Sequence, residues 1–252
     1  MVTEAMTQTP EFLSQPGPRC RTCGQELAPG CDGSGIVEYV EGVDALGYPW
    51  LARHGCKNLI AAKQVKRFDW LSGIFPQPTL YGDVMLDEPI TGKHAWQEPH
   101  RVRLIVALSE RRGAVIRSNA NLVGKSRMAM SASNFSRRHG QPGIFLNVPQ
   151  MLAAIRATFE HDSPEDFTES ELICALSEIP LLVLDDLGKE RGTPFAEEVL
   201  FRVVNSRYQN AMPVIVTTNL RGAELMQTDR SHAIVRRLTD GAEVIQFEPA
   251  PP

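Results

Sequence analysis

The stretch LLVLDDLG, residues 181–188, is the segment that decides the fold. Its run of apolar residues is typical of a strand buried on both faces, and two acids follow where such a strand ends. One carboxylate at this place can hold Mg²⁺, usually through water, and a second can orient or activate the water that attacks a phosphate. Asp185 is therefore a candidate magnesium ligand and Asp186 a candidate catalytic residue, while the alternative is a strand end with two solvated acids.

Similar apolar or β-branched runs recur on both sides of this stretch, and segments with helical spacing separate them. Strands that alternate with helices predict a parallel sheet covered by helices on both faces. We therefore expect an α/β fold with a five-stranded parallel sheet. The predicted strands are residues 113–117, 143–148, 180–184, 213–217 and 242–247.

The segment 193–208 carries the clearest helix signals. Thr193 is a suitable N-cap, and Pro194 follows at the first helical position, where its missing N–H costs nothing. Apolar spacing then predicts one buried face of this helix. That face consists of Phe195, Val199, Val203 and Tyr208.

Upstream, NANLVGKS (residues 119–126) lies between a predicted strand and a predicted helix, as a phosphate-binding loop G-x-x-x-x-G-K-[ST] does. Gly124, Lys125 and Ser126 match the motif, whereas Asn119 stands at its first glycine and Leu122 at a further position where a glycine is usual. Asn accepts a left-handed backbone, so the first replacement is mild; a leucine held there costs about 1–2 kcal/mol. Taken alone, a match of three residues to the motif also arises by chance.

Downstream, PVIVTTNL (residues 213–220) is another apolar run that ends in polar residues. Thr217, Thr218 and Asn219 would lie at the tip of a strand, where they could hold the attacking water; a polar turn is the alternative. In an open parallel sheet the carboxyl ends of the strands meet at one edge, where ligands bind. The loop, the acids and this tip together predict a site for ATP and Mg²⁺.

At this point the chain resembles a known family. The stretches LLVLDDLGKE, VVNSRYQN and MPVIVTTNL are similar to those of the AAA+ ATPase domain of bacterial DnaC/DnaI-type replicative helicase loaders, and IstB-type transposition helpers share them. The resemblance runs from about residue 102 to 247. It implies an AAA+ P-loop NTPase domain that binds a replicative DNA helicase and places it on single-stranded DNA. A transposition regulator is the alternative that the IstB relatives imply.

The resemblance also assigns roles to individual residues. Asn119 and Gly124 belong to the loop, and Lys125 and Ser126 would contact phosphates and magnesium. Asp185 would serve the magnesium, Asp186 the catalytic water, and Asn219 would be the sensor of the bound phosphate.

In SHAIVRRLTDG, Arg237 matches the arginine finger that completes a neighbouring subunit's site, with Arg236 as the second choice. This role implies self-association through the AAA+ domain, because one cation compensates charge on another subunit's phosphoryl group. The departures at Asn119 and Leu122 leave two outcomes, a weak ATPase and a non-hydrolysing adaptor.

Four of the five cysteines fall in the first 56 residues, which favours metal binding over disulfides. Zinc needs four ligands in a tetrahedron. We expect them to be Cys20, Cys23, Cys31 and Cys56, with His54 competing for either later position. The predicted organisation of the chain is a flexible tail (1–18), a zinc-binding module (19–56), a helical linker (57–99) and the AAA+ domain (100–252).

The charge and the apolar content of the chain limit which classes of partner it can bind. A net charge of −4 argues against a protein that coats DNA generally, but residues 100–140 hold nine Lys/Arg against one acid. Arg127, Arg137 and Arg138 in this basic segment are candidates for contacting phosphates of single-stranded DNA in a central pore. No apolar stretch approaches the roughly 18 residues that cross a bilayer, and no signal-peptide core is visible, so we expect a cytoplasmic protein that does not contact a membrane.

Overall fold

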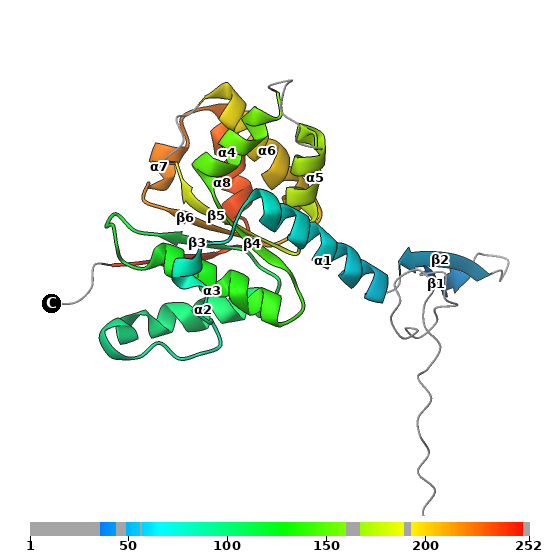
Figure 1. The fold of residues 1–252 in the computed structure, drawn as a ribbon, viewed down its shortest axis with the longest axis horizontal. Coiled ribbons are helices and arrows are strands. Elements are labelled where there is room, and N and C mark those ends of the chain that lie inside the picture. Colours follow the sequence, from blue (N-terminus) through cyan, green and yellow to red (C-terminus); the bar gives the residue numbers. More distant parts are fainter. Residues whose placement is uncertain (1–35, 44–48, 56, 160–166, 189–192, 249–252) are drawn as a thin grey trace, which may run out of the picture. The chain divides into compact units, whose positions relative to one another are not determined.

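The computed structural model divides the chain into two compact units, residues 1–63 and 64–252, which are described separately. In the first unit, β1 (Ile36–Val43) pairs antiparallel with β2 (Pro49–Gly55), as Figure 1 shows. The described residues are 36–43, 49–55, 57–159, 167–188 and 193–248.

The second unit is built on a five-stranded parallel sheet with the strand order β4-β5-β6-β3-β7. All five strands form where the sequence predicted them. Because β3 is the first of these strands in the chain but lies inside the sheet, the connections run on both faces, as doubly wound α/β folds require. The strands are β3 (Ala114–Arg117), β4 (Gly143–Asn147), β5 (Leu181–Leu187), β6 (Val214–Thr218) and β7 (Glu243–Gln246).

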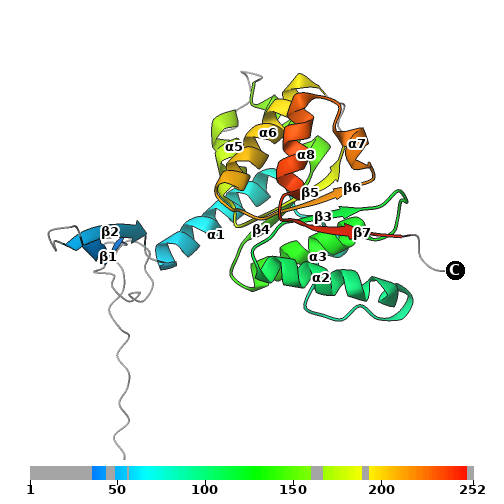
Figure 2. The same cartoon turned by 180° about the vertical axis from the view of Figure 1, so that it is seen from behind.

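Helices cover both faces of this sheet (Figures 1 and 2). One face packs against α2 (Glu98–Ser109) and α3 (Lys125–Arg138). The other packs against the later part of α1 (Lys57–Ile74) and four further helices. These are α4 (Val148–Ala157), α5 (Glu169–Glu178), α6 (Pro194–Gln209) and α8 (Asp229–Thr239), while the short α7 (Gly222–Leu225) precedes α8.

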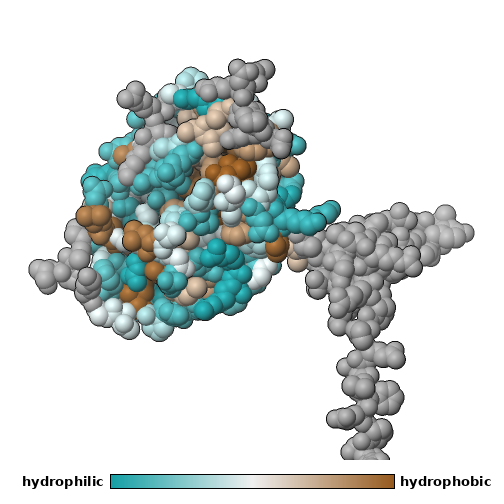
Figure 3. Space-filling view, viewed as in Figure 1, coloured by the Kyte–Doolittle hydropathy of each residue, from teal (hydrophilic) through white to brown (hydrophobic). Residues whose placement is uncertain are grey.

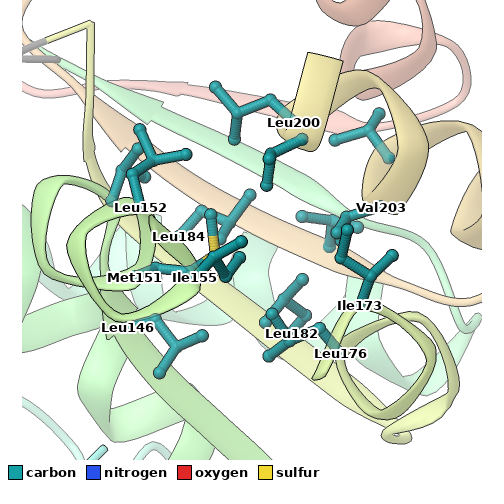
Figure 4. Close-up of a cluster of buried hydrophobic side chains, with 14 of the residues drawn as sticks. Leu146, Met151, Leu152, Ile155, Ile173, Leu176, Leu182, Leu184, Leu200 and Val203 are labelled. Carbon is teal, nitrogen blue, oxygen red and sulfur yellow. The ribbon is translucent and has the colours of Figure 1, made fainter. Parts of the chain in front are cut away.

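The packing of the core on both faces of the sheet explains why the strands are continuous apolar runs in the sequence. Along β5, Leu182 and Leu184 pack against the α4–α5–α6 side (Figure 4), and Leu181 and Val183 pack against the α2–α3 side. Successive side chains of a strand point to opposite faces, so a strand with helices on both sides needs an apolar residue at every position.

The helix start at Thr193 is confirmed, since its Oγ1 accepts a hydrogen bond from the N–H of Ala196 at 3.2 Å and Pro194 is the first helical residue. The predicted buried face is wrong at Tyr208, whose residue is 47% exposed. At 100° per residue, Tyr208 lies half a turn away from Val199. The buried position beside it belongs to Arg207, which is completely buried.

Residues 73–99, the later part of the predicted helical linker (57–99), contain two short 3-10 helices, η1 (Thr79–Tyr81) and η2 (Gly92–Gln97). Leu86 in this segment is fully buried in the core. The side-chain amide of Asn134 on α3 donates to three backbone carbonyls of the segment, those of Tyr81, Gly82 and Val84. The sequence did not single out α2, which begins one residue before Pro99.

Exposed apolar residues of the second unit are separate from one another on the face shown in Figure 3, where patches of hydrophobic colour are divided by hydrophilic residues. The most exposed large apolar side chains are those of Leu122 and Leu80. Within the residues that the structure describes, no helix is both long enough and apolar enough to cross a membrane.

Candidate functional site

The loop between β3 and α3 lies at the carboxyl edge of the sheet (Figure 1). Its last residue, Gly124, is the N-cap of α3 and has a left-handed backbone with φ of 93°. Leu122 is also left-handed, with φ of 59°, and its side chain is fully exposed. No packing of this side chain offsets the backbone strain, so the leucine is an uncompensated cost. Asn119 is not left-handed, so its replacement of glycine requires no such backbone.

Two buried side chains hold the loop in place. The ammonium of Lys125, which is 7% exposed, donates to the carbonyl of Ala120 in the loop at 3.0 Å. The side-chain amide of Gln97 donates to the carbonyl of Val123 at 2.9 Å. A Cβ at Gly124 would lie 2.8 Å from Gln97 Nε2, so this position needs a glycine both for its φ and for the space.

The hydroxyl of Ser126, on the first turn of α3, lies against the end of β5. Its Oγ donates to Oδ2 of Asp185 at 3.1 Å. The other carboxylate oxygen of Asp185, Oδ1, accepts from the hydroxyl of Thr217 on β6 at 2.6 Å. The structure therefore brings together Lys125, Ser126 and Asp185, three residues that the sequence proposed for one site, although 59 positions separate the last two.

Asp186 follows in an unusual conformation. Its φ is 62°, and the pairing of β5 with β6 is irregular between Leu184 and Leu187. The N–H of Asp186 donates to the hydroxyl of Thr217 at 2.9 Å, and its carboxylate accepts a longer bond of 3.4 Å from the side-chain amide of Asn147 at the end of β4. A left-handed non-glycine residue is uncommon and costs free energy, which is typical of functional sites.

Asn219, directly after β6, contacts Asn121 of the phosphate loop. Its side-chain amide donates to Oδ1 of Asn121 at 3.2 Å. Its own Oδ1 is buried and has no hydrogen-bond partner among the described residues. A buried amide oxygen without a donor costs about 1–3 kcal/mol, and a bound ligand or water beside it would supply one.

The residues at this edge fit a magnesium nucleotide. Ser126 Oγ and Asp185 Oδ2 are both oxygen ligands of the kind Mg²⁺ takes, and adjacent corners of an octahedron with ligands at about 2.1 Å are about 3 Å apart, close to the 3.1 Å between these atoms. The N-terminus of α3 offers backbone N–H groups and the positive end of the helix dipole to a phosphate. Lys125 begins that same helix.

The two arginines of the SHAIVRRLTDG motif lie in the last turn of α8, immediately before the start of β7. This is the amino edge of the parallel sheet, opposite to the phosphate loop. Arg237 donates to Oδ1 of Asn205 at 2.9 Å and packs over the rings of Phe201 and Tyr208. Arg236 is exposed. A single chain therefore does not bring either arginine to its own Lys125.

The other predicted sites are placed as follows. Arg137 donates to Asn134 and packs over Phe68, and Arg138 pairs with Asp87, so two of the three arginines proposed for DNA already contact their own chain. The four predicted zinc ligands, Cys20, Cys23, Cys31 and Cys56, lie outside the described residues. Among the residues that the structure does describe, no group of three or more His, Cys, Asp or Glu could hold a metal ion.

Three residues of this edge were missed by sequence reasoning. Asn147 carried a usable signal, because it is a polar residue in the carboxyl-terminal part of a predicted strand, where the candidate acids and Asn219 also lie. Asn121 is inside the loop that was identified, but no motif marks it. Gln97 belongs to a segment without periodicity and had no signal.

Comparison with known proteins assigns the chain to a family. The family model described as "IstB-like ATP binding protein" matches residues 104–249, more than half of the chain. The chain belongs to the IstB-like ATP-binding family. This assignment agrees with the position of the phosphate loop and of the two acids at one edge of the sheet.

Individual relatives of this IstB-like chain are distant. It is 31% identical over 126 residues to the uncharacterized protein YdaV of Escherichia coli (strain K12), which is 49% of this chain and 48% of YdaV. It is 24% identical over 97 residues to the replicative helicase loader DnaC of Buchnera aphidicola subsp. Acyrthosiphon pisum, 38% of this chain and 39% of that one. The chain thus spans about half or less of the length of these curated relatives.

The solved structure of the DnaC helicase loader superimposes with a TM-score of 0.53 at 20% identity, covering 68% of this chain and 100% of that one. At this identity the likeness shows the fold alone. The second unit therefore shares the overall α/β fold of that DnaC structure.

Proposed function

We propose that this protein is an ATP-controlled helicase loader that binds a replicative hexameric helicase and places it on single-stranded DNA. The observation that carries the nucleotide part is the 3.1 Å contact between Ser126 and Asp185, beside Lys125 at the start of α3. The family and the DnaC-like fold support the loader part. The curated DnaC relatives are replicative helicase loaders by name.

Each residue of the edge has a role in this proposal. Lys125 would exchange the carbonyl of Ala120 for a phosphate oxygen, and Ser126 and Asp185 would hold Mg²⁺, which would supply charge neutralisation at the phosphates. Asp186 orients the attacking water and accepts its proton. Asn219 would be the sensor, and its buried, unpartnered Oδ1 beside the loop supports this role because it could accept a hydrogen bond from that water.

Hydrolysis in this scheme requires a second subunit. Arg237 and Arg236 lie at the amino edge of the sheet, so they reach a phosphoryl group only in a neighbouring copy or a partner ATPase. Arg237 would first release Asn205, whereas Arg236 is already exposed. Self-association through the AAA+ unit is therefore part of the proposal.

The zinc-binding module, residues 19–56, is proposed to engage the helicase or the single-stranded DNA, and residues 57–99 to link it to the AAA+ domain at 100–252. Zinc analysis of the purified protein tests this part. We expect one Zn²⁺ per chain, lost in Cys20→Ser, and a metal-free wild-type protein would refute it.

A second candidate function is a transposition regulator, and the match to the IstB-like family model favours it. Such a protein would bind duplex DNA together with a recombinase instead of a ring helicase. A third candidate, a non-hydrolysing adaptor, is favoured by the strained Leu122 in the phosphate loop.

The deciding experiment measures ATP hydrolysis by wild type and Lys125→Ala, with and without single-stranded DNA, and copurification with a hexameric replicative helicase. The loader is supported by nucleotide-dependent copurification that Lys125→Ala loses. Copurification with hydrolysis at the Lys125→Ala background would favour the adaptor. Binding to duplex DNA without helicase capture would overturn the loader and favour the transposition regulator.

A further inference from the structure

The side chain that joins the two candidate acids is Thr217, on the central strand β6. Its residue is completely buried, and its hydroxyl makes two hydrogen bonds, donating to Asp185 Oδ1 at 2.6 Å and accepting from the N–H of Asp186 at 2.9 Å. A hydroxyl has one proton. Because the N–H of Asp186 donates to the hydroxyl oxygen, the hydroxyl proton is directed to Asp185. Thr217 therefore gives its only proton to Asp185 and cannot also donate it to a water.

The contact with Asp185 decides which of its oxygens faces the phosphate loop. Oδ1 is turned toward β6 by Thr217, and Oδ2 is left to meet Ser126 at 3.1 Å. The χ2 torsion of an aspartate is broad, so the hydrogen bond from Thr217 restricts rotation of the carboxylate. The β-branched threonine has a restricted χ1, which makes it a firm anchor.

The contact with Asp186 acts on the backbone. Here β5 departs from regular pairing with β6, and the N–H of Asp186 bonds to a side chain at the point where the ladder is interrupted. This bond helps to hold Asp186 at φ of 62°, a conformation that would otherwise relax. One hydroxyl thus fixes the carboxylate of the first acid and the direction from which the second acid projects.

We infer that Thr217 is a positioning residue that sets the orientation of Asp185 and Asp186 toward the magnesium nucleotide. The inference rests on the proposed nucleotide site and adds a residue that does not itself touch the ligand. It acts as the outer partners of metal-bound carboxylates do, whose loss typically costs roughly 10- to 100-fold in metal affinity or activity.

The test compares Thr217→Val, which keeps the shape and removes the hydroxyl, with Thr217→Ser, which keeps the hydroxyl. Affinity for a fluorescent N-methylanthraniloyl ATP is measured in MgCl₂ and in EDTA, together with the Mg²⁺ concentration that gives half-maximal binding. We expect Thr217→Val to bind the nucleotide in EDTA as wild type does but to need roughly 10- to 100-fold more Mg²⁺. Thr217→Ser should restore most of the wild-type requirement.

Thr218→Val is the matched control. Thr218 is equally buried on the same strand, but its hydroxyl donates to the carbonyl of Leu187 at 2.7 Å and not to an acid. It should lower thermal stability and leave the Mg²⁺ requirement unchanged. An equal shift in Thr217→Val and Thr218→Val, or no shift in Thr217→Val, would overturn the inference. Wild-type protein that binds no nucleotide in either buffer would instead overturn the proposed function.

Discussion

The two edges of the parallel sheet are held together in different ways. At the carboxyl edge, the candidate magnesium site is a series of bonds between side chains, those of Ser126, Asp185 and Thr217. At the amino edge, the buried guanidinium of Arg207 donates to backbone carbonyls, among them those of Ile179 and Pro213, both at 2.7 Å. Backbone acceptors cannot move without unfolding the turns they belong to, whereas side chains can exchange partners. The amino edge is therefore built for stability and the carboxyl edge for ligand exchange.

Replacing Arg207 is expected to have the largest effect. Burial lowers the pKa of Arg207 to about 9, so it is still protonated at pH 7 and serves its carbonyls as a cation. Arg207→Met fills the space but removes the donor that the guanidinium supplies to these carbonyls, and a buried carbonyl left without any donor costs about 1–3 kcal/mol. We expect the free energy of unfolding, measured with urea, to fall by roughly 2–5 kcal/mol.

Arg202→Met on the same helix is the control for Arg207→Met. Arg202 pairs with Glu169 at 2.5 Å, but its side chain is 39% exposed, so its loss should cost no more than about 1 kcal/mol. Equal losses of stability in the two variants would show that burial against backbone carbonyls does not distinguish the amino edge.

The second prediction concerns the carboxyl edge. Asp185→Asn keeps the shape and can keep the bonds to Ser126 and Thr217, so unfolding should change by no more than about 1 kcal/mol. The lost charge should weaken binding of the magnesium nucleotide by roughly 10- to 100-fold, since a charged contact contributes about 1.5–3 kcal/mol. Titration calorimetry with Mg²⁺ and with EDTA checks this. A loss of stability as large as that of Arg207→Met would contradict the distinction between the edges.

The same distinction explains what could be predicted from the sequence. Lys125 with Ser126, and Asp185 with Asp186, are neighbours in the chain, so their spacing is visible as a motif. The contacts of Thr217 and Asn147 depend on how β6 and β4 are aligned with β5, which no local pattern encodes. The sheet itself was predictable, because five strands buried on both faces leave continuous apolar runs.

At the amino edge the prediction from apolar spacing was wrong for a physical reason. Charged residues are almost never fully buried, so apolar spacing placed Tyr208 on the inner face and did not single out Arg207. Four backbone carbonyls, from Leu176, Ile179, Pro180 and Pro213, compensate the burial of the guanidinium. Three of those carbonyls belong to one segment 27 to 31 positions earlier in the chain, and only the folded structure brings that segment to Arg207.

Backbone strain offers a smaller and matched comparison. Leu122 at the carboxyl edge and Ala211 at the amino edge are both exposed and left-handed, with φ of 59° and 49°. Glycine removes a strain of about 1–2 kcal/mol and adds unfolded-state entropy worth about 0.4–1 kcal/mol. Leu122→Gly and Ala211→Gly should each raise the free energy of unfolding by roughly 0.5–1 kcal/mol.

Only Leu122→Gly should also strengthen nucleotide binding, because it alone changes the loop that receives the phosphate. Urea unfolding and nucleotide titration of both variants check the pair. A gain of affinity in Ala211→Gly as well would show that general rigidity, and not the loop, controls the site.

The smallest effect is expected at Glu98, a partly exposed residue whose carboxylate bonds to the backbone. Glu98 accepts from Arg101 and from the N–H of Ile90, and these bonds lower its pKa from 4.5 to about 2, the hydrogen bond from Arg101 contributing most. An acid with a lowered folded pKa stabilises the protein above its unfolded pKa and loses that contribution as the pH falls through the folded pKa. The difference in melting temperature between wild type and Glu98→Gln should therefore be full at pH 7, shrink below about pH 4.5 and vanish near pH 2. Because the Glu98 side chain is 32% exposed, salt should reduce the difference. A difference that persists at pH 2 or is insensitive to salt would assign it to packing instead of charge.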